Sequence, residues 1–347
     1  MEKNKYFEED LINMANSIDL DKFDNTTIFI TGVTGLIGSL LTRAVMKCNE
    51  IRNSDIKVIG LARNKEKTEV IFKDFLSNKN LKFVYTDIIK EIKVDDDIDY
   101  IIHCASMTQS KFFITNPVDT IDITLKGTSN VLNLAKEKNV KNMIYVSSME
   151  VYGFVSDNEK KMDESQLGFI DPLNIRSCYS EGKRMAECLC SSFAHQYNIN
   201  VCVARLAQTF GAGIDKSENR VFAQFAKSSI NNKDIVLKTK GESYGNYCYT
   251  SDAIRGLFTI LDKGISSNAY NVVNENSTMQ IKDMARLVAE KISDNKIDLV
   301  FDISDNSCYA PDTKLRLSSK KLNSLGWNAE VDMLSSYKRM ISWIKSL

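Results

Sequence analysis

The chain has 347 residues, of which 43% are hydrophobic, enough to fill one large domain or two closely packed ones. Lysine plus arginine equals aspartate plus glutamate at 45 each, so no basic field attracts nucleic acid or an anionic membrane. The first residues, MEKNKYFEED, are too polar for a secretory signal, no apolar run is as long as a membrane span, and the eight cysteines include no CxxC pair. We therefore expect a cytoplasmic globular protein with reduced cysteines, no metal, and no nucleic-acid or membrane partner.

Hydrophobic periodicity predicts alternating helices and strands along the chain. Residues 3–18 carry apolar side chains at helical spacing and are predicted to form an N-terminal helix that packs on the main body. After it, β-branched runs alternate with amphipathic stretches, which is typical of βαβ units in a parallel sheet. The predicted strands are 27–31, 57–61, 82–85, 100–103, 143–147 and 201–206, and the predicted helices are 37–47, 65–76, 117–138 and 177–197.

A glycine-rich turn follows the first predicted strand. Gly32 can form the tight turn, Gly35 lets backbone N–H groups approach a pyrophosphate, and Gly38 permits close contact between helix and strand. Leu36 and Ile37 then open a helix whose N-terminus favours an anion. Glycines at this spacing also occur in ordinary loops, but their place at the first strand-to-helix junction favours dinucleotide binding.

These patterns indicate an α/β fold, a doubly wound parallel sheet (Rossmann) with a smaller C-terminal substrate-binding part. After residue 206, helices are predicted at 218–229 and 279–292, and strands at 234–238 and 298–302. We divide the chain into an N-terminal extension (1–24), a dinucleotide-binding domain (25–206) and a mainly substrate-binding domain (207–347), with segments near 247–275 returning to the core.

Two further motifs carry hydroxyl groups and a cation. Tyr179 and Lys183 are four residues apart in a predicted helix, so they share one face. An ammonium near a phenol is expected to lower its pKa, and a tyrosinate can accept a proton from a substrate hydroxyl. Such a pair also occurs by chance on protein surfaces. Ser148 directly follows the predicted strand 143–147, at the end of a parallel strand, where α/β folds bind ligands.

The chain resembles the extended short-chain dehydrogenases, which include nucleotide-sugar epimerases, dehydratases and decarboxylases. The resemblance lies in the motif TGxxGxxG at residues 31–38, followed in order by Ser148, Tyr179 and Lys183. The resemblance covers roughly residues 25–345. It implies that Tyr179 is the catalytic acid/base and that Ser148 hydrogen-bonds the reacting hydroxyl. It also implies a cofactor site made by Gly32, Gly35, Leu36, Ile37, Gly38, Arg63, Asp87, Ile88, Ala105 and Lys183.

The segment after the second strand leaves the choice of cofactor open. Members of this family that prefer NAD usually carry an acid there, whereas this chain has Ala62-Arg63-Asn64. Arg63 and Lys65 either receive the 2′-phosphate of NADP or are solvated surface cations. We expect NAD, with NADP as the alternative.

The segment from Ser148 to Gly153 indicates the reaction. Its Ser-x-Glu-Val-Tyr-Gly pattern resembles nucleotide-sugar dehydratases and UDP-glucuronate decarboxylases, while 4-epimerases commonly lack the acid at Glu150. Glu150 is expected to move protons around a keto intermediate, or it only pairs within the loop. Met149 stands where glucose-type dehydratases often have an aspartate.

The first interpretation is an enzyme that oxidises sugar C4 to a 4-keto intermediate, similar to UDP-glucuronate decarboxylase. The alternatives are a 4,6-dehydratase, a 4-epimerase or, from another class, a non-catalytic dinucleotide-binding scaffold.

Three departures from the family affect the substrate. Gln208 replaces an asparagine near the substrate phosphate, Gly245 replaces a phosphate-binding arginine, and Thr124 replaces a helix asparagine. Arg220 and Arg316 are expected to compensate at the nucleotide-sugar site.

The resemblance also implies a homodimer formed through the helices predicted at 117–138 and 177–197. These helices carry more apolar side chains than packing against one face of a sheet obviously requires, namely Val131, Leu132, Leu134, Met185, Leu189 and Phe193.

Overall fold

The computed structural model describes residues 4–155, 160–303 and 312–347, and its main element is a sheet of seven parallel strands. Most residues of these strands are buried, as expected for a parallel sheet with both faces covered. The predicted α/β doubly wound fold is confirmed. In spatial order the strands are β3 (Leu81–Tyr85), β2 (Lys57–Ala62), β1 (Thr27–Thr31), β4 (Tyr100–His103), β5 (Asn142–Ser148), β6 (Val201–Leu206) and β10 (Ala269–Val272).

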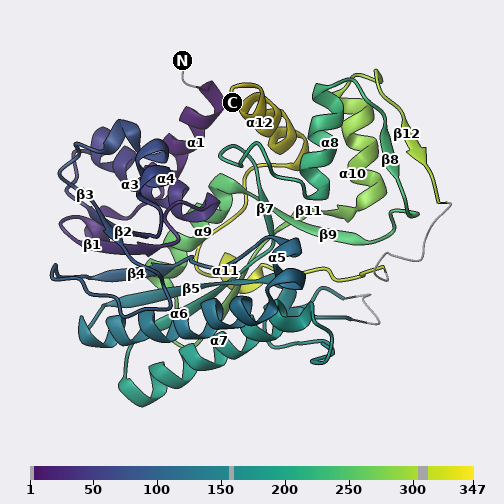
Figure 1. Cartoon of the computed structure of the whole chain (residues 1–347). Coiled ribbons are helices and arrows are strands. Elements are labelled where there is room, and N and C mark those ends of the chain that lie inside the picture. Colours follow the sequence, from purple (N-terminus) through teal and green to yellow (C-terminus); the bar gives the residue numbers. More distant parts are fainter. Residues whose placement is uncertain (1–3, 156–159, 304–311) are drawn as a thin grey trace.

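Helices cover both faces of this sheet (Figure 1). The long helices α6 (Pro117–Glu137) and α7 (Ser177–Tyr197) lie together against one face. The other face is covered by α3 (Leu36–Arg52) and α9 (Thr250–Lys263), with α1 (Lys5–Asn16) packed on both of them. Each side has its own hydrophobic core.

The apolar positions of α6 are used inside the chain. Val131, Leu132 and Leu134 are buried in the core between α6, α7 and the sheet, so they are not the surplus that the sequence indicated. Leu189 and Phe193 of α7 are partly buried against the same core. These side chains pack against their own sheet because the parallel strands expose apolar residues on both faces.

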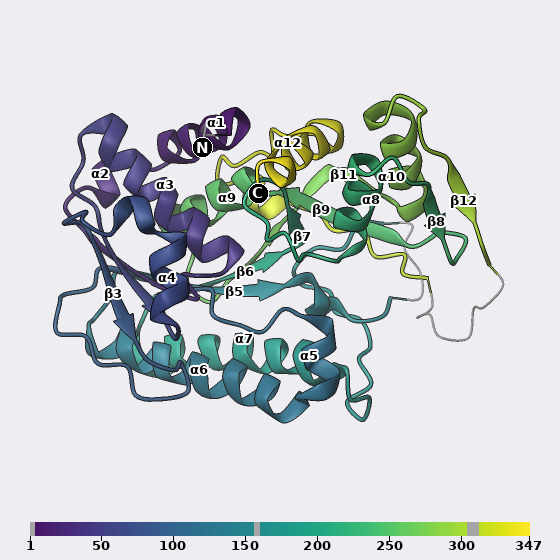
Figure 2. The same ribbon diagram turned by 45° about the horizontal axis from the view of Figure 1, so that its top comes forward.

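A second lobe lies at the carboxyl ends of the large sheet's strands (Figure 2). Between β9 (Tyr244–Tyr249) and β11 (Asn274–Gln280) the chain returns to the large sheet as α9 and β10. The pattern of residues predicted none of the strands β7 (Gln208–Phe210), β9 and β11. The strand β11 is rich in polar residues, and β7 is only three residues long. The lobe contains a three-stranded sheet of β11 (Asn274–Gln280), β9 (Tyr244–Tyr249) and β7 (Gln208–Phe210), a parallel pair of β8 (Ile235–Leu237) and β12 (Leu299–Phe301), and the helices α8 (Val221–Ile230), α10 (Ile281–Leu287) and α12 (Met333–Lys345).

Several predicted helices have different boundaries. The helix predicted at 65–76 is α4 (Lys65–Ile71) followed by a 3-10 turn (Lys73–Phe75), because Phe72 turns into the core. The helix predicted at 279–292 starts only at Ile281 and continues from α10 as a π-helix over Val288–Ile292. The remaining short helices are α2 (Leu20–Phe23), α5 (Ser110–Thr115), α11 (Lys320–Asn323) and the 3-10 turn Met149–Tyr152.

Buried hydrogen bonds tie the N-terminal helix to the second lobe. Asp10 of α1 accepts a hydrogen bond from the Tyr249 hydroxyl at 2.5 Å and pairs with Arg339 of α12 at 2.8 Å. Since these contacts join three distant segments, α1 belongs structurally to the main body.

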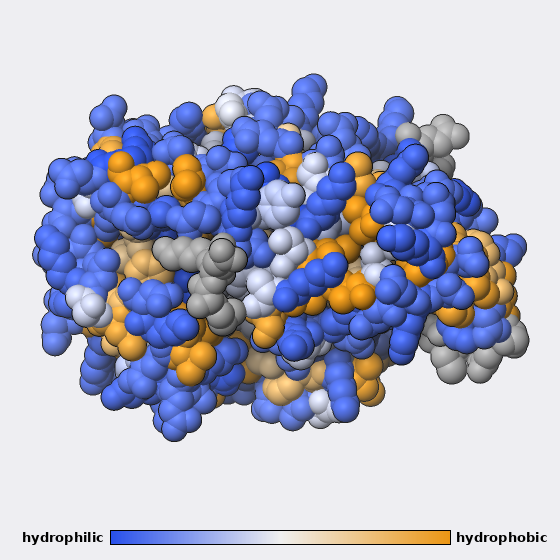
Figure 3. Space-filling view, turned by 90° about the horizontal axis from the view of Figure 1, so that it is seen from above, coloured by the Kyte–Doolittle hydropathy of each residue, from blue (hydrophilic) through white to orange (hydrophobic). Residues whose placement is uncertain are grey.

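The surface is mixed in character. On the face that is seen from above, hydrophilic side chains cover most of the area and apolar ones form smaller patches between them (Figure 3). No helix in the described segments is both long enough and apolar enough to span a membrane. The seven cysteines among the described residues are free thiols, while Cys308 lies outside these residues.

Candidate active site

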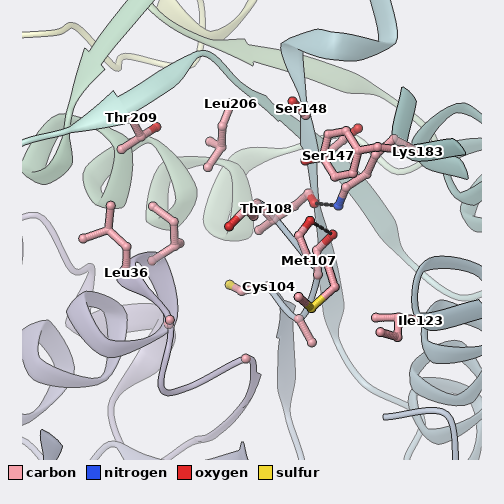
Figure 4. Close-up of a pocket in the computed structure, with 18 of the residues that line it drawn as sticks. Leu36, Cys104, Met107, Thr108, Ile123, Ser147, Ser148, Lys183, Leu206 and Thr209 are labelled. Atoms are coloured by element: carbon pink, nitrogen blue, oxygen red, sulfur yellow. Dashed lines mark hydrogen bonds between the residues drawn. The ribbon is translucent and has the colours of Figure 1, made fainter. Parts of the chain in front are cut away.

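A cavity of about 540 Å³ lies along the carboxyl ends of the parallel strands. Its walls come from residues that follow β1, β2, β4, β5 and β6, together with α7 and the start of α8. Leu36 and Thr209 lie on one side of it, and Ser147, Ser148 and Lys183 lie on the other (Figure 4). This is the edge at which open α/β sheets bind ligands.

The glycine turn forms one wall of the cavity and leaves no space for side chains. Gly32 has φ +65°, and a Cβ there would lie 2.8 Å from the backbone of Ala105. A Cβ on Gly38 would lie 2.4 Å from the carbonyl oxygen of Gly32. The N-terminus of α3 at Gly35 has no side-chain cap, so its first N–H groups face the cavity without a side-chain acceptor. This cradle fits the pyrophosphate of a dinucleotide.

A buried histidine holds the glycine turn to its neighbours. The Oγ1 of Thr31 accepts a hydrogen bond from the Ala105 N–H and lies 2.7 Å from Nδ1 of His103. Nε2 of His103 lies 3.1 Å from the hydroxyl of Thr128, which itself donates to the Thr124 carbonyl. Burial lowers the pKa of His103 to about 3, so the ring is neutral. The pattern assigns the proton to Nε2 and fixes β1, β4 and α6 around the turn.

Two cations lie at the end of the cavity next to β2. Arg63 and Lys67 both line it, and Arg63 faces Asp87 with Nη1 and Oδ2 3.8 Å apart. Ile88 is also in the wall, whereas Asp87 itself is outside it. Lys65, which the sequence offered as a phosphate ligand, faces Glu69 and does not line the cavity. Sequence reasoning missed Lys67.

Tyr179 and Lys183 project from α7 and are both buried beside Ser148. The ammonium of Lys183 donates to the Val146 carbonyl at 2.9 Å and lies 5.8 Å from the centre of the Tyr179 ring. Burial lowers the pKa of Lys183 to about 8, although Glu187 opposes the shift.

The structure corrects the expected direction of the tyrosine pKa. Burial and then the charge of Glu150 raise the pKa of Tyr179 above its usual range, against a hydrogen bond with Ser148. The charges of Arg220 and Arg176 also lower this pKa but do not overcome the burial, so Tyr179 is a neutral phenol in the isolated chain. Ionisation therefore requires further positive charge in the cavity.

Glu150 is placed at the cavity by the short turn that follows β5. Ser148 caps this turn by accepting a hydrogen bond from the Glu150 N–H at 3.2 Å. The carboxylate lies 3.3 Å from Nη2 of Arg176 and 3.3 Å from the Ser180 hydroxyl. Glu150 is thus held at the wall, and Arg176 partly balances its charge.

An aromatic stack supports Tyr179. Phe113 of α5 is parallel to the Tyr179 ring within 13°, with centroids 4.4 Å apart. The guanidinium of Arg176 lies 5.4 Å from the centre of the Phe113 ring. Sequence reasoning missed Phe113 and Arg176, because their place at the site depends on loops that packing brings together.

A buried ion pair fixes α7 against the sheet. Glu187, one turn after Lys183, pairs with Arg205 of β6 at 2.7 Å and accepts a hydrogen bond from Ser147 of β5 at 2.6 Å. Arg205 also donates to the Tyr152 hydroxyl at 3.2 Å. Breaking such a pair leaves an uncompensated charge, which typically costs about 3–5 kcal/mol.

The fold and the glycine cradle agree with a match to known proteins. Residues 28–273 match the family described as the NAD dependent epimerase/dehydratase family. The chain belongs to this family. Its members include enzymes of nucleotide-sugar metabolism, so the scaffold without activity that the sequence left open is not supported.

Similar proteins include several named UDP-glucuronic acid decarboxylase. UDP-glucuronic acid decarboxylase 1 of Xenopus tropicalis is 28% identical over 330 residues, which cover 94% of this chain and 74% of that protein. UDP-glucuronic acid decarboxylase 6 of Arabidopsis thaliana is 28% identical over 311 residues, covering 89% and 86%.

Solved structures share the fold at lower identity. The UDP-glucuronic acid 4-epimerase of Bacillus cereus, in complex with NAD, has a TM-score of 0.75 at 21% identity and covers 92% of this chain and 99% of its own. The dTDP-glucose 4,6-dehydratase of Bacillus anthracis, also with NAD, has a TM-score of 0.75 at 18% identity, covering 92% and 97%. NAD is the cofactor of the epimerase/dehydratase family to which the chain belongs.

The predicted substrate residues lie in different places. Gln208 and Arg220 line the cavity, and Arg220 pairs with Glu218 at 2.6 Å. Arg316 is not in the cavity wall, since its guanidinium packs 5.3 Å from the centre of the Tyr244 ring.

At Gly245, where many family members carry an arginine, a Cβ would lie 2.4 Å from the Tyr247 ring. The Tyr247 ring therefore fills the space into which a side chain at this position would extend. No group of three or more His, Cys, Asp or Glu side chains within the described ranges could hold a metal.

Proposed function

We propose that the chain is an NAD-dependent enzyme that oxidises C4 of a nucleotide sugar to a 4-keto intermediate. The observation that carries this proposal is the meeting of Ser148, Glu150, Tyr179 and Lys183 in one cavity with the glycine cradle. A dinucleotide-binding module without chemistry has no need of a buried lysine and a buried tyrosine beside a carboxylate.

We assign the cofactor to the residues predicted from the sequence. Backbone N–H groups at the start of α3 would hold the pyrophosphate, and Ala105 and Ile88, which line the cavity, would pack beside the cofactor. Bound NAD supplies the hydride acceptor and a positive nicotinamide ring. Tyr179, whose ionised form burial disfavours in the isolated chain, would lose its proton more readily beside that positive ring.

Each side chain has a distinct role in this proposal. Tyr179 removes the proton of the C4 hydroxyl while Ser148 hydrogen-bonds the same oxygen, and Lys183 stabilises the tyrosinate. Glu150 acts after oxidation, when the 4-keto group makes neighbouring positions acidic. Gln208 and Arg220 contact the substrate, and the pairing of Arg220 with Glu218 keeps its guanidinium at the rim.

Decarboxylation of a UDP-glucuronate-like substrate is the reaction that we favour. The relatives support it, because those at 28% identity bear the name UDP-glucuronic acid decarboxylase. The alternatives are 4,6-dehydration and 4-epimerisation, and the structural neighbours include examples of each. Glu150 favours a reaction with a proton transfer after oxidation over a plain epimerisation.

A panel of UDP- and dTDP-linked hexoses and uronic acids, followed by mass spectrometry of the products, tests the proposal. Loss of carbon dioxide is expected from the uronic acid. Loss of water would assign a dehydratase, and an isomer of unchanged mass would assign an epimerase. A chain that binds NAD and converts none of the panel would contradict the proposed function.

We further propose that the protein is a cytoplasmic homodimer that associates through α6 and α7. The support is a set of exposed apolar side chains, namely Ile114 of α5, Val118 and Ile121 of α6, and Met185 of α7. The helices α6 and α7 form the outermost layer on that side of the sheet (Figure 1). Light scattering should give a mass twice that of the 39.2 kDa chain, and the double variant Val118→Asp, Met185→Asp should have the mass of a single chain. A monomeric wild type at micromolar concentration would exclude this interface.

The division of the chain into an N-terminal extension, a dinucleotide-binding domain and a mainly substrate-binding domain, with boundaries at residues 24 and 206, is likewise a proposal.

A further inference from the structure

The cavity has an unusual charge at the end where the adenosine ribose would lie. In dinucleotide-binding folds an acid after the second strand binds the ribose hydroxyls, whereas an arginine nearby accommodates a 2′-phosphate. Here Arg63 follows directly after β2, and Lys67 joins it in the cavity wall. Among the described residues of that wall, Glu150 is the one carboxylate, and it lies at the opposite end beside Tyr179.

The guanidinium of Arg63 is available to a ligand. Its side chain is 60% exposed, and the distance of 3.8 Å to Asp87 is too long for a hydrogen bond. Ion pairs between exposed groups contribute little, so a phosphate can compete with Asp87 for the guanidinium. Arginine also binds phosphate in a bidentate manner, which a distant carboxylate cannot match.

Local structure places Lys67 beside Arg63. Asn64, between them in sequence, is the N-cap of α4 and accepts a hydrogen bond from the Lys67 N–H at 2.8 Å. This contact sets the first turn of the helix and brings the Lys67 side chain to the cavity. Lys65 differs, because its ammonium faces Glu69 one turn later and lies outside the wall.

We infer that Arg63 and Lys67 form a subsite for the 2′-phosphate of the dinucleotide, so that NADP binds more tightly than NAD. The inference rests on the dinucleotide site proposed above. Asp87 then has a second role: it holds the Arg63 side chain near the ribose when the phosphate is absent.

The test compares two small probes that differ only in the phosphate, adenosine 2′,5′-bisphosphate and 5′-AMP. Calorimetric titration of the full chain should show the bisphosphate binding about tenfold or more tightly. Arg63→Gln should remove most of this difference and leave 5′-AMP binding unchanged, and Lys67→Gln should remove part of it. Lys65→Gln is the matched control, since it removes the same charge two residues away and should leave both affinities unchanged.

Three results would overturn the inference. They are equal affinity of the wild type for both probes, no binding of either probe, and an equal loss in the Lys65→Gln and Arg63→Gln variants, which would reveal general charge attraction. Titration with NADP and NAD should give the same ranking as the probes. The proposed function can fail separately: a chain that prefers NADP but converts no nucleotide sugar keeps the subsite and loses the function. Conversion with NAD together with rejection of NADP would remove only the subsite.

Discussion

The two ends of the cavity are built from different parts of the chain. The glycine turn is made of backbone, and its shape depends on the absence of side chains at Gly32 and Gly38. The reaction end is made of side chains, with Tyr179 and Lys183 buried and Glu150 facing Arg176. Backbone can hold a phosphate at no electrostatic cost to the empty chain, whereas buried ionisable groups oppose folding. The reaction end should therefore govern turnover, and the glycine turn should govern cofactor binding.

The largest expected effect follows removal of the Tyr179 oxygen. Tyr179→Phe keeps the stack on Phe113, so the fold and dinucleotide affinity should be unchanged. Turnover should fall by about 10²–10⁴, the usual contribution of a positioned acid/base. Steady-state assay of the product together with calorimetric titration of NAD measures both.

Tyr337→Phe is the matched control for this variant. Tyr337 is also a buried tyrosine, but it lies in α12 of the second lobe, and its hydroxyl has no hydrogen-bond partner among the described residues. Loss of this hydroxyl should leave turnover within a few-fold of the wild-type value. Equal losses in both variants would mean that Tyr179 has only a packing role.

Glu150 divides the reaction end further. Glu150→Gln keeps the size of the side chain and removes its charge, so oxidation should proceed while the later proton transfer fails. Turnover should fall by about 10²-fold or more, and reduced nicotinamide should accumulate to about one per site. Near-ultraviolet absorbance after rapid mixing of enzyme and substrate measures the amount of reduced nicotinamide.

Ser180→Ala provides the comparison for Glu150→Gln. It removes one contact to the carboxylate but retains the charge, so a change of only a few-fold in turnover is expected. If Glu150→Gln turns over at the wild-type rate, the glutamate is structural and the reaction is closer to a plain epimerisation or reduction.

Sequence reasoning predicted the local structure where an arrangement depends on one short segment. The glycine turn, the strand before it and the helix after it are continuous from Thr27 to Arg52, so spacing alone predicted their arrangement. Tyr179 and Lys183 share one helix face for the same reason. The raised pKa of Tyr179 was not predictable, because the tyrosine is buried by packing against Phe113 of α5 and Met107, which are distant from α7 in the sequence.

The residues that sequence reasoning missed depend on long-range packing. Phe113 reaches Tyr179 from a helix of six residues with no strong periodicity, and Arg176 meets Glu150 across a long connection. Arg316 was misplaced for a related reason. Its segment runs beside β9, where the hydrogen bond from the Tyr244 N–H to Thr313 directs the chain along the lobe.

A pair of glycine substitutions tests the backbone end. Gly38→Ala puts a methyl group 2.4 Å from the Gly32 carbonyl, so the turn must shift. We expect a loss of about 1–3 kcal/mol in stability and of tenfold or more in dinucleotide affinity, as overpacking against a rigid backbone causes. Denaturant unfolding and NAD titration measure these changes.

Gly182→Ala is the matched substitution in the helix of Tyr179. Its new methyl group would lie 3.6 Å from the Thr124 side chain, an ordinary contact, and alanine favours a helix over glycine by roughly 0.5–1 kcal/mol. We expect a neutral or stabilising change with NAD affinity retained. If Gly38→Ala binds NAD as tightly as Gly182→Ala does, the turn does not form the phosphate cradle.

The smallest expected effect is the cost of burying Lys183. Its pKa is about 8 in the folded chain against 10.5 for the free side chain, so from pH 8 to 10.5 the unfolded chain binds more protons at this residue. The free energy of unfolding must therefore rise with pH across that window as far as Lys183 contributes to it, and burying this ammonium costs most below pH 8.

Lys183→Met tests this cost, because it removes the ammonium, keeps an unbranched apolar side chain and loses the hydrogen bond to the Val146 carbonyl. At pH 7 we expect the variant to be about 1–2 kcal/mol more stable, since a shift of this size is worth on the order of 3 kcal/mol before the lost hydrogen bond is subtracted. The difference in unfolding free energy between variant and wild type should shrink as the pH rises to 10.5, because other groups titrate alike in both chains. A difference that is constant over this range would show that Lys183 does not lose its proton on folding, and the reaction end would then carry no electrostatic cost from its lysine.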